Sequence, residues 1–186
     1  MEHSNVLDCK TPDEFRKWLE DNHLTQNECW IKCKRGKPVE GVFSYIDAVY
    51  VALSFGWIDS THGLVDGVRM QRFSPRRKNS HWSELNKERC RWLINHELMS
   101  ENGFKQLPDL NEEFVIDEDI LKALKSDEEI WNNFNEFPDL YRRIKIGNIQ
   151  RERKKEDVFN RMLNNFLKKT KEGKMTGNWN DYGRLD

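Results

Sequence analysis

The side chains best suited to chemistry gather between positions 55 and 91. They are two indoles, one carboxylate and four cations: Trp57, Asp59, Arg72, Arg76, Arg77, Lys78 and Trp82. Guanidinium and ammonium groups bind anions, and indole rings stack on bases or pack against a partner. The stretch lacks a nucleophile paired with a base, which covalent catalysis needs. It therefore suits recognition of an anion, a nucleic acid or a protein better than catalysis.

A predicted β-hairpin positions Asp59 and Arg72. Asp66-Gly67 favours a type I′ turn, because that turn needs positive φ at both central residues. With Val65 opposite Val68, strand alternation sets Asp59 and Arg72 on one face, near enough to pair diagonally. Two interpretations stay open, a modest ion pair between neighbouring strands and a working site.

Cysteine and histidine spacing does not predict a metal centre. Cys29 and Cys33 have the separation of one zinc-ligand pair, but a second pair is missing. On an extended strand their α-carbons lie roughly 13 Å apart, too far for one ion. Cys90 falls in a predicted helix without an indicated base, and no glycine-rich phosphate loop is found. We therefore expect no metal, no cofactor and no catalytic residue.

Two helices and a strand are predicted before the hairpin. The capping box Thr11-Pro12-Asp13-Glu14 begins a helix that runs to Asn22. Serine and aspartate at 44–47 begin a second helix, which Gly56 ends in a left-handed cap. Polar and apolar residues alternate over 28–35, which predicts a strand.

The pattern after Ser80 is helical nearly to the end. Ser126 with Glu129 forms a further capping box, and the last helix, about 151–172, has one apolar face. The expected fold class is α+β. A small antiparallel sheet of about three strands forms in the N-terminal half, covered by helices, and a helical C-terminal half follows.

A single domain, 1–186, is the expected organisation, since this length is typical of one hydrophobic core. Two lobes, 10–107 and 116–172, are the alternative, because the weakest join falls at 108–115. The segment 175–186 is polar and glycine-containing and is expected to be a loose tail.

Charge is divided along the chain although the formal net charge is −1. Acidic residues dominate between Pro108 and Leu140, and basic residues dominate after Arg142. Either the two blocks neutralise one another across the fold, or they leave a basic face for an acidic partner.

The sequence predicts a cytoplasmic protein. No stretch approaches the roughly 20 apolar residues of a membrane-spanning helix, and the first ten residues lack the apolar core of a signal peptide. Without an export signal, the four cysteines are expected to be thiols.

Several short motifs belong together as a pattern. They are Phe55-Gly56-Trp57-Ile58-Asp59, Gln71-Arg72-Phe73-Ser74-Pro75-Arg76-Arg77, Trp82-Ser83, Asn86 and Arg89, with fainter similarity at Phe15-Arg16-Lys17-Trp18-Leu19 and in the basic helix after Arg151. In these motifs the chain resembles the YdeI/OmpD-associated family of bacteriocin-protection proteins over most of residues 10–172. Two departures are Asn79, where the pattern has a Gly, and Gly147-Asn148, which is expected to interrupt a helix. The resemblance implies a link to envelope stress and antimicrobial-peptide tolerance with no established reaction, so it implies no catalytic residue.

Three classes of function follow. The expected one is a non-enzymatic binding or stress-protection protein, in which the loop of Arg76, Arg77 and Lys78 and neighbouring aromatic residues receive an unknown protein or a small anionic ligand. The first alternative is a nucleic-acid binder through the basic loop from Arg72 to Trp82, although the near-neutral net charge weighs against it. The second is an enzyme for an anionic small molecule, with Asp59 as general base. The full set of candidate binding residues is Trp57, Asp59, Arg72, Arg76, Arg77, Lys78, Trp82 and Asn86.

Overall fold

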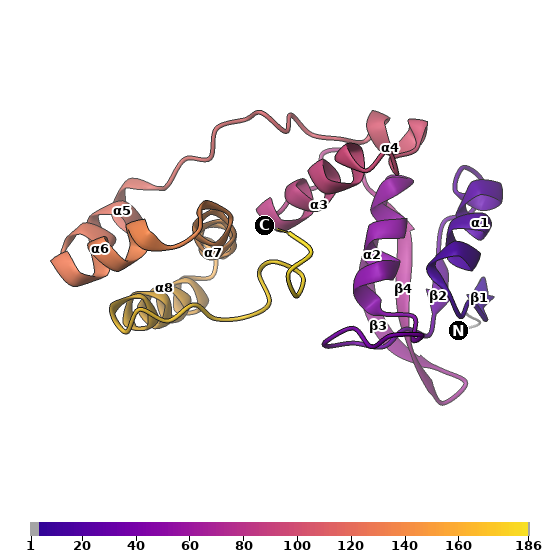
Figure 1. Cartoon of the computed structure of the whole chain (residues 1–186), viewed down its shortest axis with the longest axis horizontal. Helices are drawn as coiled ribbons and strands as arrows, with labels where there is room; N and C mark the ends of the chain where they lie inside the picture. The colour runs from indigo at the N-terminus through magenta and orange to yellow at the C-terminus, as the bar shows by residue number, and fades with distance from the viewer. Residues whose placement is uncertain (1–3, 186) are drawn as a thin grey trace. The chain divides into compact units, whose positions relative to one another are not determined.

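The computed structural model describes residues 4–185 and confirms the α+β class (Figure 1). The chain divides into two units. The first comprises the chain up to His81 with Glu88–Leu110, and the second comprises Trp82–Lys87 with the chain from Asn111 onward. Helix α3 (Glu84–Asn95) begins in the second unit and continues in the first.

The first unit is a four-stranded sheet with helices. Its other elements are β1 (Val6–Leu7), α1 (Pro12–Asn22), β2 (Cys29–Ile31), α2 (Tyr45–Ser54), β3 (Trp57–Val65), β4 (Val68–Pro75) and α4 (Glu101–Lys105). The strand order is β1-β2-β4-β3, with β1 parallel to β2 and the other pairs antiparallel. An antiparallel sheet of about three strands was expected, and β1 is a fourth strand that the sequence did not predict. A two-residue strand is too short for side-chain alternation to reveal it.

Local signals set the helices and the hairpin as predicted. Thr11 Oγ1 accepts a hydrogen bond from the Glu14 amide at 3.2 Å, so Thr11 caps the helix as predicted. The Glu14 carboxylate accepts from the Lys10 amide at 2.6 Å, one residue before the position that a capping box uses. Gly56 has φ of +73° after α2, the left-handed cap that the sequence predicts. Asp66 and Gly67 have φ of +49° and +77°, as a type I′ turn requires. These motifs succeed because each depends only on neighbouring residues.

Aromatic side chains form the core beneath the sheet. Phe15 of α1 and Phe73 of β4 are both fully buried, with ring centroids 5.4 Å apart. Cys29 and Ile31 of β2 are also fully buried, and Cys29 pairs with Phe73 in the sheet register. The short strand β2 is therefore a central element of the packing, even though its ordered length is less than the predicted 28–35.

The second unit is helical. Besides the start of α3, its helices are α5 (Glu118–Lys125), α6 (Glu128–Glu136), α7 (Asp139–Arg151) and α8 (Glu156–Lys171). Its core is a cluster of apolar residues from all of α5 to α8, including Ile120, Leu124, Phe134, Tyr141, Ile146, Phe159 and Phe166. Trp179 packs edge-on against Tyr141 at 5.8 Å, and Leu185 is buried.

Three predicted details of the second unit are wrong. Helix α7 continues through Gly147, because the apolar face around that position is packed and a glycine costs a packed helix only about 1 kcal/mol. The cap of α6 is Asp127, whose carboxylate accepts from the Glu129 and Ile130 amides, so Ser126 is not the cap. The last helix begins at Glu156, since a turn separates it from α7.

Opposite charges pair within the second unit. Arg153 reaches the α5 end through Asp119 at 2.6 Å and Asp117, and Lys171 reaches Asp127 at 2.6 Å. These pairs join the acidic block to the basic block, as the first of the two charge interpretations requires. These pairs are largely open to solvent, with Asp127 half-buried, so each stabilises the unit only slightly.

Within residues 4–185, no helix has both the length and the apolar character that crossing a membrane requires.

Candidate functional site

The candidate binding residues lie in different environments. Trp57 is fully buried, donates from Nε1 to the His23 carbonyl at 3.2 Å and packs edge-on against Trp18 at 5.9 Å. It is therefore part of the core of the first unit. Trp82 and Asn86 belong to the second unit, where Ser83 Oγ accepts from the Asn86 amide at 3.3 Å at the start of α3.

The predicted contact between Asp59 and Arg72 does not form, because the hairpin contains a β-bulge. Val65 pairs with Val68 as predicted, and this register holds as far as His62 opposite Gln71. The register then shifts between His62 and Asp59, so that two residues of β3 oppose one of β4. A one-residue shift turns every following side chain to the other face of the sheet. Asp59 therefore lies opposite Phe73.

Arg72 forms an ion pair on the opposite face. Its Nε lies 2.6 Å from Glu28 Oε2, and its Nη1 donates to Ser60 Oγ at 3.0 Å. The hydrogen bond from Arg72 is the main reason why the pKa of Glu28 is lowered, with Ser4 and Trp30 also donating to this carboxylate. Arg72 thus holds the loop before β2 against β4.

The Glu28–Arg72 pair predicts a pH effect. Because the folded-state pKa of Glu28 is lowered, its contribution is present above about pH 4.5 and is lost as pH falls through the folded value. We expect Glu28→Gln to cost about 1 kcal/mol at pH 7 and the difference from wild type to shrink toward pH 3. Urea unfolding at both pH values measures this. A difference that stays constant between the two would contradict it.

Asp59 accepts a short hydrogen bond from a tyrosine. The Tyr45 hydroxyl donates to Asp59 Oδ2 at 2.6 Å, and the Arg35 guanidinium lies over the Tyr45 ring, 4.5 Å from its centroid. Burial, and then the Asp59 charge and hydrogen bond, raise the pKa of Tyr45. The pair joins α2 to β3, and the phenol stays protonated and holds the carboxylate.

The basic loop after β4 divides into engaged and exposed cations. Arg76 donates from Nη2 to the His81 carbonyl at 2.5 Å, and burial lowers the pKa of its guanidinium. Arg77 and Lys78 are exposed on a turn in which the Ser80 amide donates to the Arg77 carbonyl at 3.1 Å. Of the loop cations, Arg77 and Lys78 are thus the ones on the surface.

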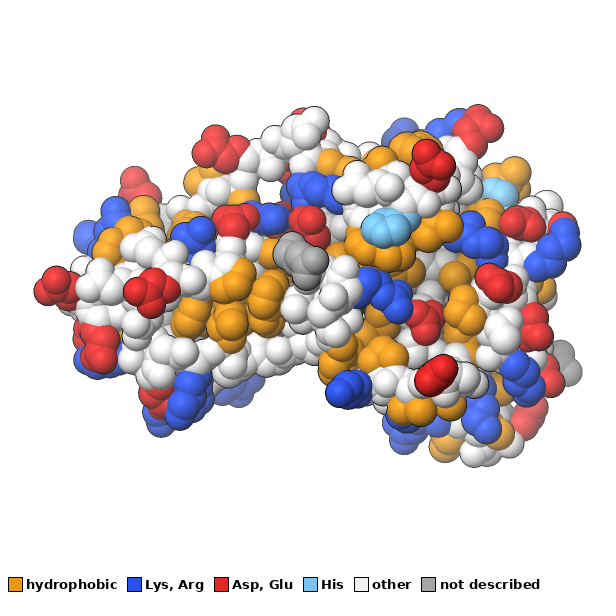
Figure 2. Space-filling model, viewed as in Figure 1, with side chains coloured by type: hydrophobic (Ala, Val, Ile, Leu, Met, Phe, Trp, Pro, Cys, Tyr) orange, Lys and Arg blue, Asp and Glu red, His pale blue; other side chains and the backbone are white. Residues whose placement is uncertain are grey.

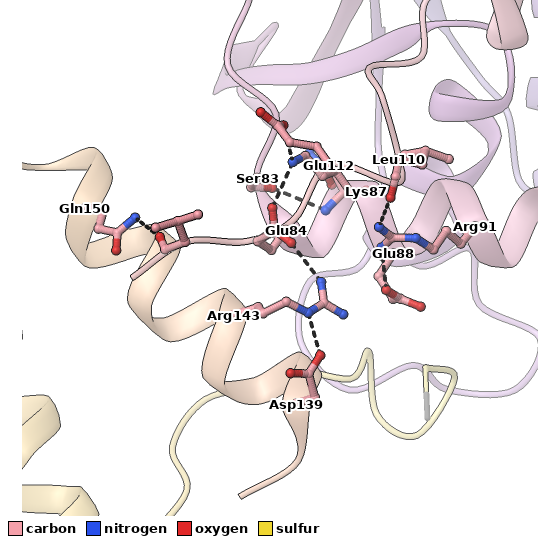
Figure 3. A network of polar contacts seen from close by, with 12 residues as sticks. Ser83, Glu84, Lys87, Glu88, Arg91, Leu110, Glu112, Asp139, Arg143 and Gln150 are labelled. Carbon is pink, nitrogen blue, oxygen red and sulfur yellow. Dashed lines mark hydrogen bonds and ion pairs between the residues drawn. The ribbon is translucent and has the colours of Figure 1, made fainter. Parts of the chain in front are cut away.

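A buried ion network lies at the start of α3, within the second unit, and the sequence did not predict it. Glu84, only 8% exposed, accepts from Arg143 Nη1 of α7 at 2.8 Å and from Lys87 Nζ at 3.1 Å. Lys87 also reaches Glu112 at 3.3 Å, and Arg143 reaches Asp139 at 2.6 Å (Figure 3). Burial alone would lower the pKa of Lys87, but hydrogen bonds and attraction from Glu84 and Glu112 raise it overall. The network is a structural connection between helices.

The candidate site that the structure reveals is a groove in the first unit, which we call the basic groove. Its volume is about 630 Å³. It is lined by Cys9, Lys10, Lys32, Cys33, Lys34, Arg35, Gly41, Val42, Phe43, His62, Arg69, Met70 and Gln71. Five lysine or arginine residues and one histidine line it, and no aspartate or glutamate does. This is the composition of an anion site.

The groove forms where β2 ends. Ile31 is the last residue of β2 to pair with β4, opposite Gln71, and the chain then leaves β4. After it, the Lys34 amide donates to the Phe43 carbonyl at 2.9 Å, and the Tyr45 amide donates to the Lys34 carbonyl at 2.8 Å. Residues 32–35 therefore form one wall with 41–43, while β4 forms the other.

Several groove side chains are held in place. The Arg35 guanidinium donates to Gln71 Oε1, and Gln71, only 2% exposed, donates to the Thr61 and Arg72 carbonyls at 3.0 and 3.1 Å. Lys10 pairs with Asp8 at the rim. Lys32 and Arg69 are exposed on opposite walls. Arg35 is thus positioned, whereas Lys32 and Arg69 face solvent at the entrance.

The two groove thiols are protonated at neutral pH. Burial raises the pKa of Cys33 to about 11, and burial is also the largest cause that raises the pKa of Cys9. A protonated thiol is a poor nucleophile and a poor metal ligand. Within residues 4–185, no group of three or more His, Cys, Asp and Glu is arranged to hold a metal ion.

The sequence contained a weak signal for this groove. A basic run lies between residues 32 and 37 and consists of Lys32, Lys34, Arg35 and Lys37. That run alone does not predict a site, because Arg69 and His62 join it only through the hairpin register. The predicted binding loop consisted instead of Arg76, Arg77 and Lys78, which are adjacent in the chain.

Two family models match the chain. Residues 7–106 match a domain of unknown function (DUF8412). Residues 113–173 match the model described as Bacteriocin-protection, YdeI or OmpD-Associated. Neither the comparison with curated proteins nor the comparison with solved structures found a match.

Proposed function

The chain belongs to the DUF8412 domain family and carries a YdeI- or OmpD-associated domain behind it, and we propose that it is a non-enzymatic binding protein for a small anionic ligand. The family resemblance is confirmed at residues 113–173, whereas the motifs at 55–89 that indicated it lie within the match at 7–106. The ligand site we propose is the basic groove, which also lies within residues 7–106.

The observation that carries this proposal is the one-sided charge of the groove. Its cations come from three separated segments, represented by Lys10, Lys32 to Arg35, and Arg69. No carboxylate is among the lining residues, although Asp8 pairs with Lys10 beside the groove. Cations that converge on one groove repel one another, and an anion bound between them relieves this repulsion. A volume of about 630 Å³ falls in the range of small-molecule pockets and is too small for a folded partner.

Binding without catalysis is supported by the state of the reactive groups. The Cys33 thiol has a raised pKa, and the Asp59 carboxylate accepts the Tyr45 hydroxyl and does not line the groove. A general base must reach the proton that it removes. A protective role under stress is part of the proposal, and it is supported by the description of the C-terminal family model as bacteriocin-protection.

We propose the cytoplasm as the compartment. Cys9, Cys29, Cys33 and Cys90 are all thiols in the structure. Thiols persist in a reducing compartment, whereas oxidising compartments favour disulfides.

Reversing charge at the entrance of the groove tests the proposal. We expect Lys32→Glu with Arg69→Glu to weaken binding of inorganic pyrophosphate about 30-fold or more, because both walls then repel the anion. Isothermal titration calorimetry at about 100 mM salt measures the affinity. Both residues are exposed, so the fold should persist, and circular dichroism verifies this.

The matched control is Arg77→Glu with Lys78→Glu, which changes the net charge equally at exposed residues outside the groove. We expect this pair to change pyrophosphate affinity less than threefold, since charges beyond a Debye length are screened. If the control pair abolishes binding and the groove pair does not, the loop after β4 is the site. If wild type binds no anion, the proposed function is wrong.

A further inference from the structure

The basic groove has an apolar side as well as a cationic one. Its apolar lining residues are Val42, Phe43 and Met70. The Val42 side chain is apolar, yet 46% of the residue is exposed to solvent. The bridge between Val39 and Val42 brings a second exposed valine to the same wall. A cluster of exposed apolar side chains at a concave site is a common feature of ligand-binding grooves, whereas a single exposed apolar side chain needs no such explanation.

The hairpin side of the groove has one exposed apolar side chain next to it, Leu64. His62 pairs with Gln71, and Leu64 pairs with Arg69, so these four side chains lie on one face of the hairpin. Three of the four line the groove, and Leu64 extends the row beyond it with 63% of its side chain exposed. Figure 2 shows hydrophobic and basic side chains next to one another over this end of the first unit.

From this juxtaposition we infer that the ligand is a soluble anionic amphiphile, bound as a monomer. This inference rests on the proposed function and names its ligand class. The anionic head lies between Lys32 and Arg69, and the apolar body lies along Val42 and Leu64. A purely polar anion would satisfy the cations and leave the apolar walls in water.

A chain-length series of alkyl phosphates tests the inference. We expect butyl, hexyl and octyl phosphate, each below its micelle concentration, to bind with affinity that rises about two- to fourfold per added methylene. Octyl phosphate should therefore bind at least about 16-fold more tightly than butyl phosphate. Octanol and octyltrimethylammonium should not bind measurably, because one lacks the anion and the other is repelled. Calorimetry at fixed salt provides each affinity.

A variant pair tests the place of the apolar body. Leu64→Ser should lower octyl phosphate affinity about fivefold, since it removes an apolar side chain from the end of the row. Leu24→Ser is the matched control, because Leu24 is also an exposed leucine of the first unit, 77% exposed, and does not line the groove. It should leave the affinity unchanged.

The outcomes separate the two proposals. If pyrophosphate binds but the alkyl phosphates show no gain with chain length, this inference is wrong and the proposed function stands. If neither binds, the proposed function fails as well. Binding to vesicles containing phosphatidylglycerol without binding of monomeric octyl phosphate would also overturn the inference, because the site would then be a lipid surface contact.

Discussion

Glu84→Gln is expected to lower the free energy of unfolding of the second unit by about 3 kcal/mol. The substitution keeps the side-chain shape and removes the charge that Lys87 and Arg143 share. Breaking a buried pair leaves a buried charge without compensation, which costs about 3–5 kcal/mol. The lower end applies here because Lys87 keeps Glu112 and Arg143 keeps Asp139, both of which are 67% exposed. Hydrogen exchange of α7 peptides measures the loss.

Glu88→Gln is the matched control for this prediction. Glu88 lies one turn further along α3 and pairs with Arg91 at 2.7 Å, in the first unit. Its side chain is 22% exposed and the pair is local to the helix, so we expect a loss below about 1 kcal/mol. Equal losses for the two variants would show that the Glu84 network stabilises the unit no more than an ordinary helix pair.

Trp57→Ala is expected to destabilise the first unit by about 3–5 kcal/mol, because it removes a fully buried indole and leaves a cavity. It also removes the contact with Trp18 and the hydrogen bond to the His23 carbonyl. Trp57→Phe should cost less, since the ring remains and only the hydrogen bond and part of the volume are lost. Urea unfolding at pH 7 measures both variants.

This series also decides between two roles for Trp57. A tryptophan that contacts ligand would lower pyrophosphate affinity without a large loss of stability. Substitution of a core tryptophan lowers stability and leaves the affinity of the folded protein unchanged. We therefore expect the folded fraction of Trp57→Phe to bind pyrophosphate within about twofold of the wild-type affinity. A Trp57 variant with wild-type stability and no pyrophosphate affinity would show that Trp57 contacts the ligand.

Features that depend on neighbours in the chain were predictable. The Thr11 cap, the left-handed Gly56 and the Asp66-Gly67 turn were each correct, because backbone dihedrals and local hydrogen bonds decide them. The α+β class followed from the same signals. The β-bulge was not predictable, since a register shift depends on which face of β3 the helices cover.

By itself, the sequence determined the two N-terminal helices with their Thr11 and Ser44 caps, the hairpin turn and the types of chemistry that the side chains can supply. Only the tertiary structure decided which of those side chains meet. It buried Trp57 in the core, paired Arg72 with Glu28 and made Lys32 and Arg69 lining residues of the same groove. The physical reason is that a local motif needs only short-range contacts, whereas a site is built from residues far apart in the chain, whose meeting depends on how the whole sheet packs.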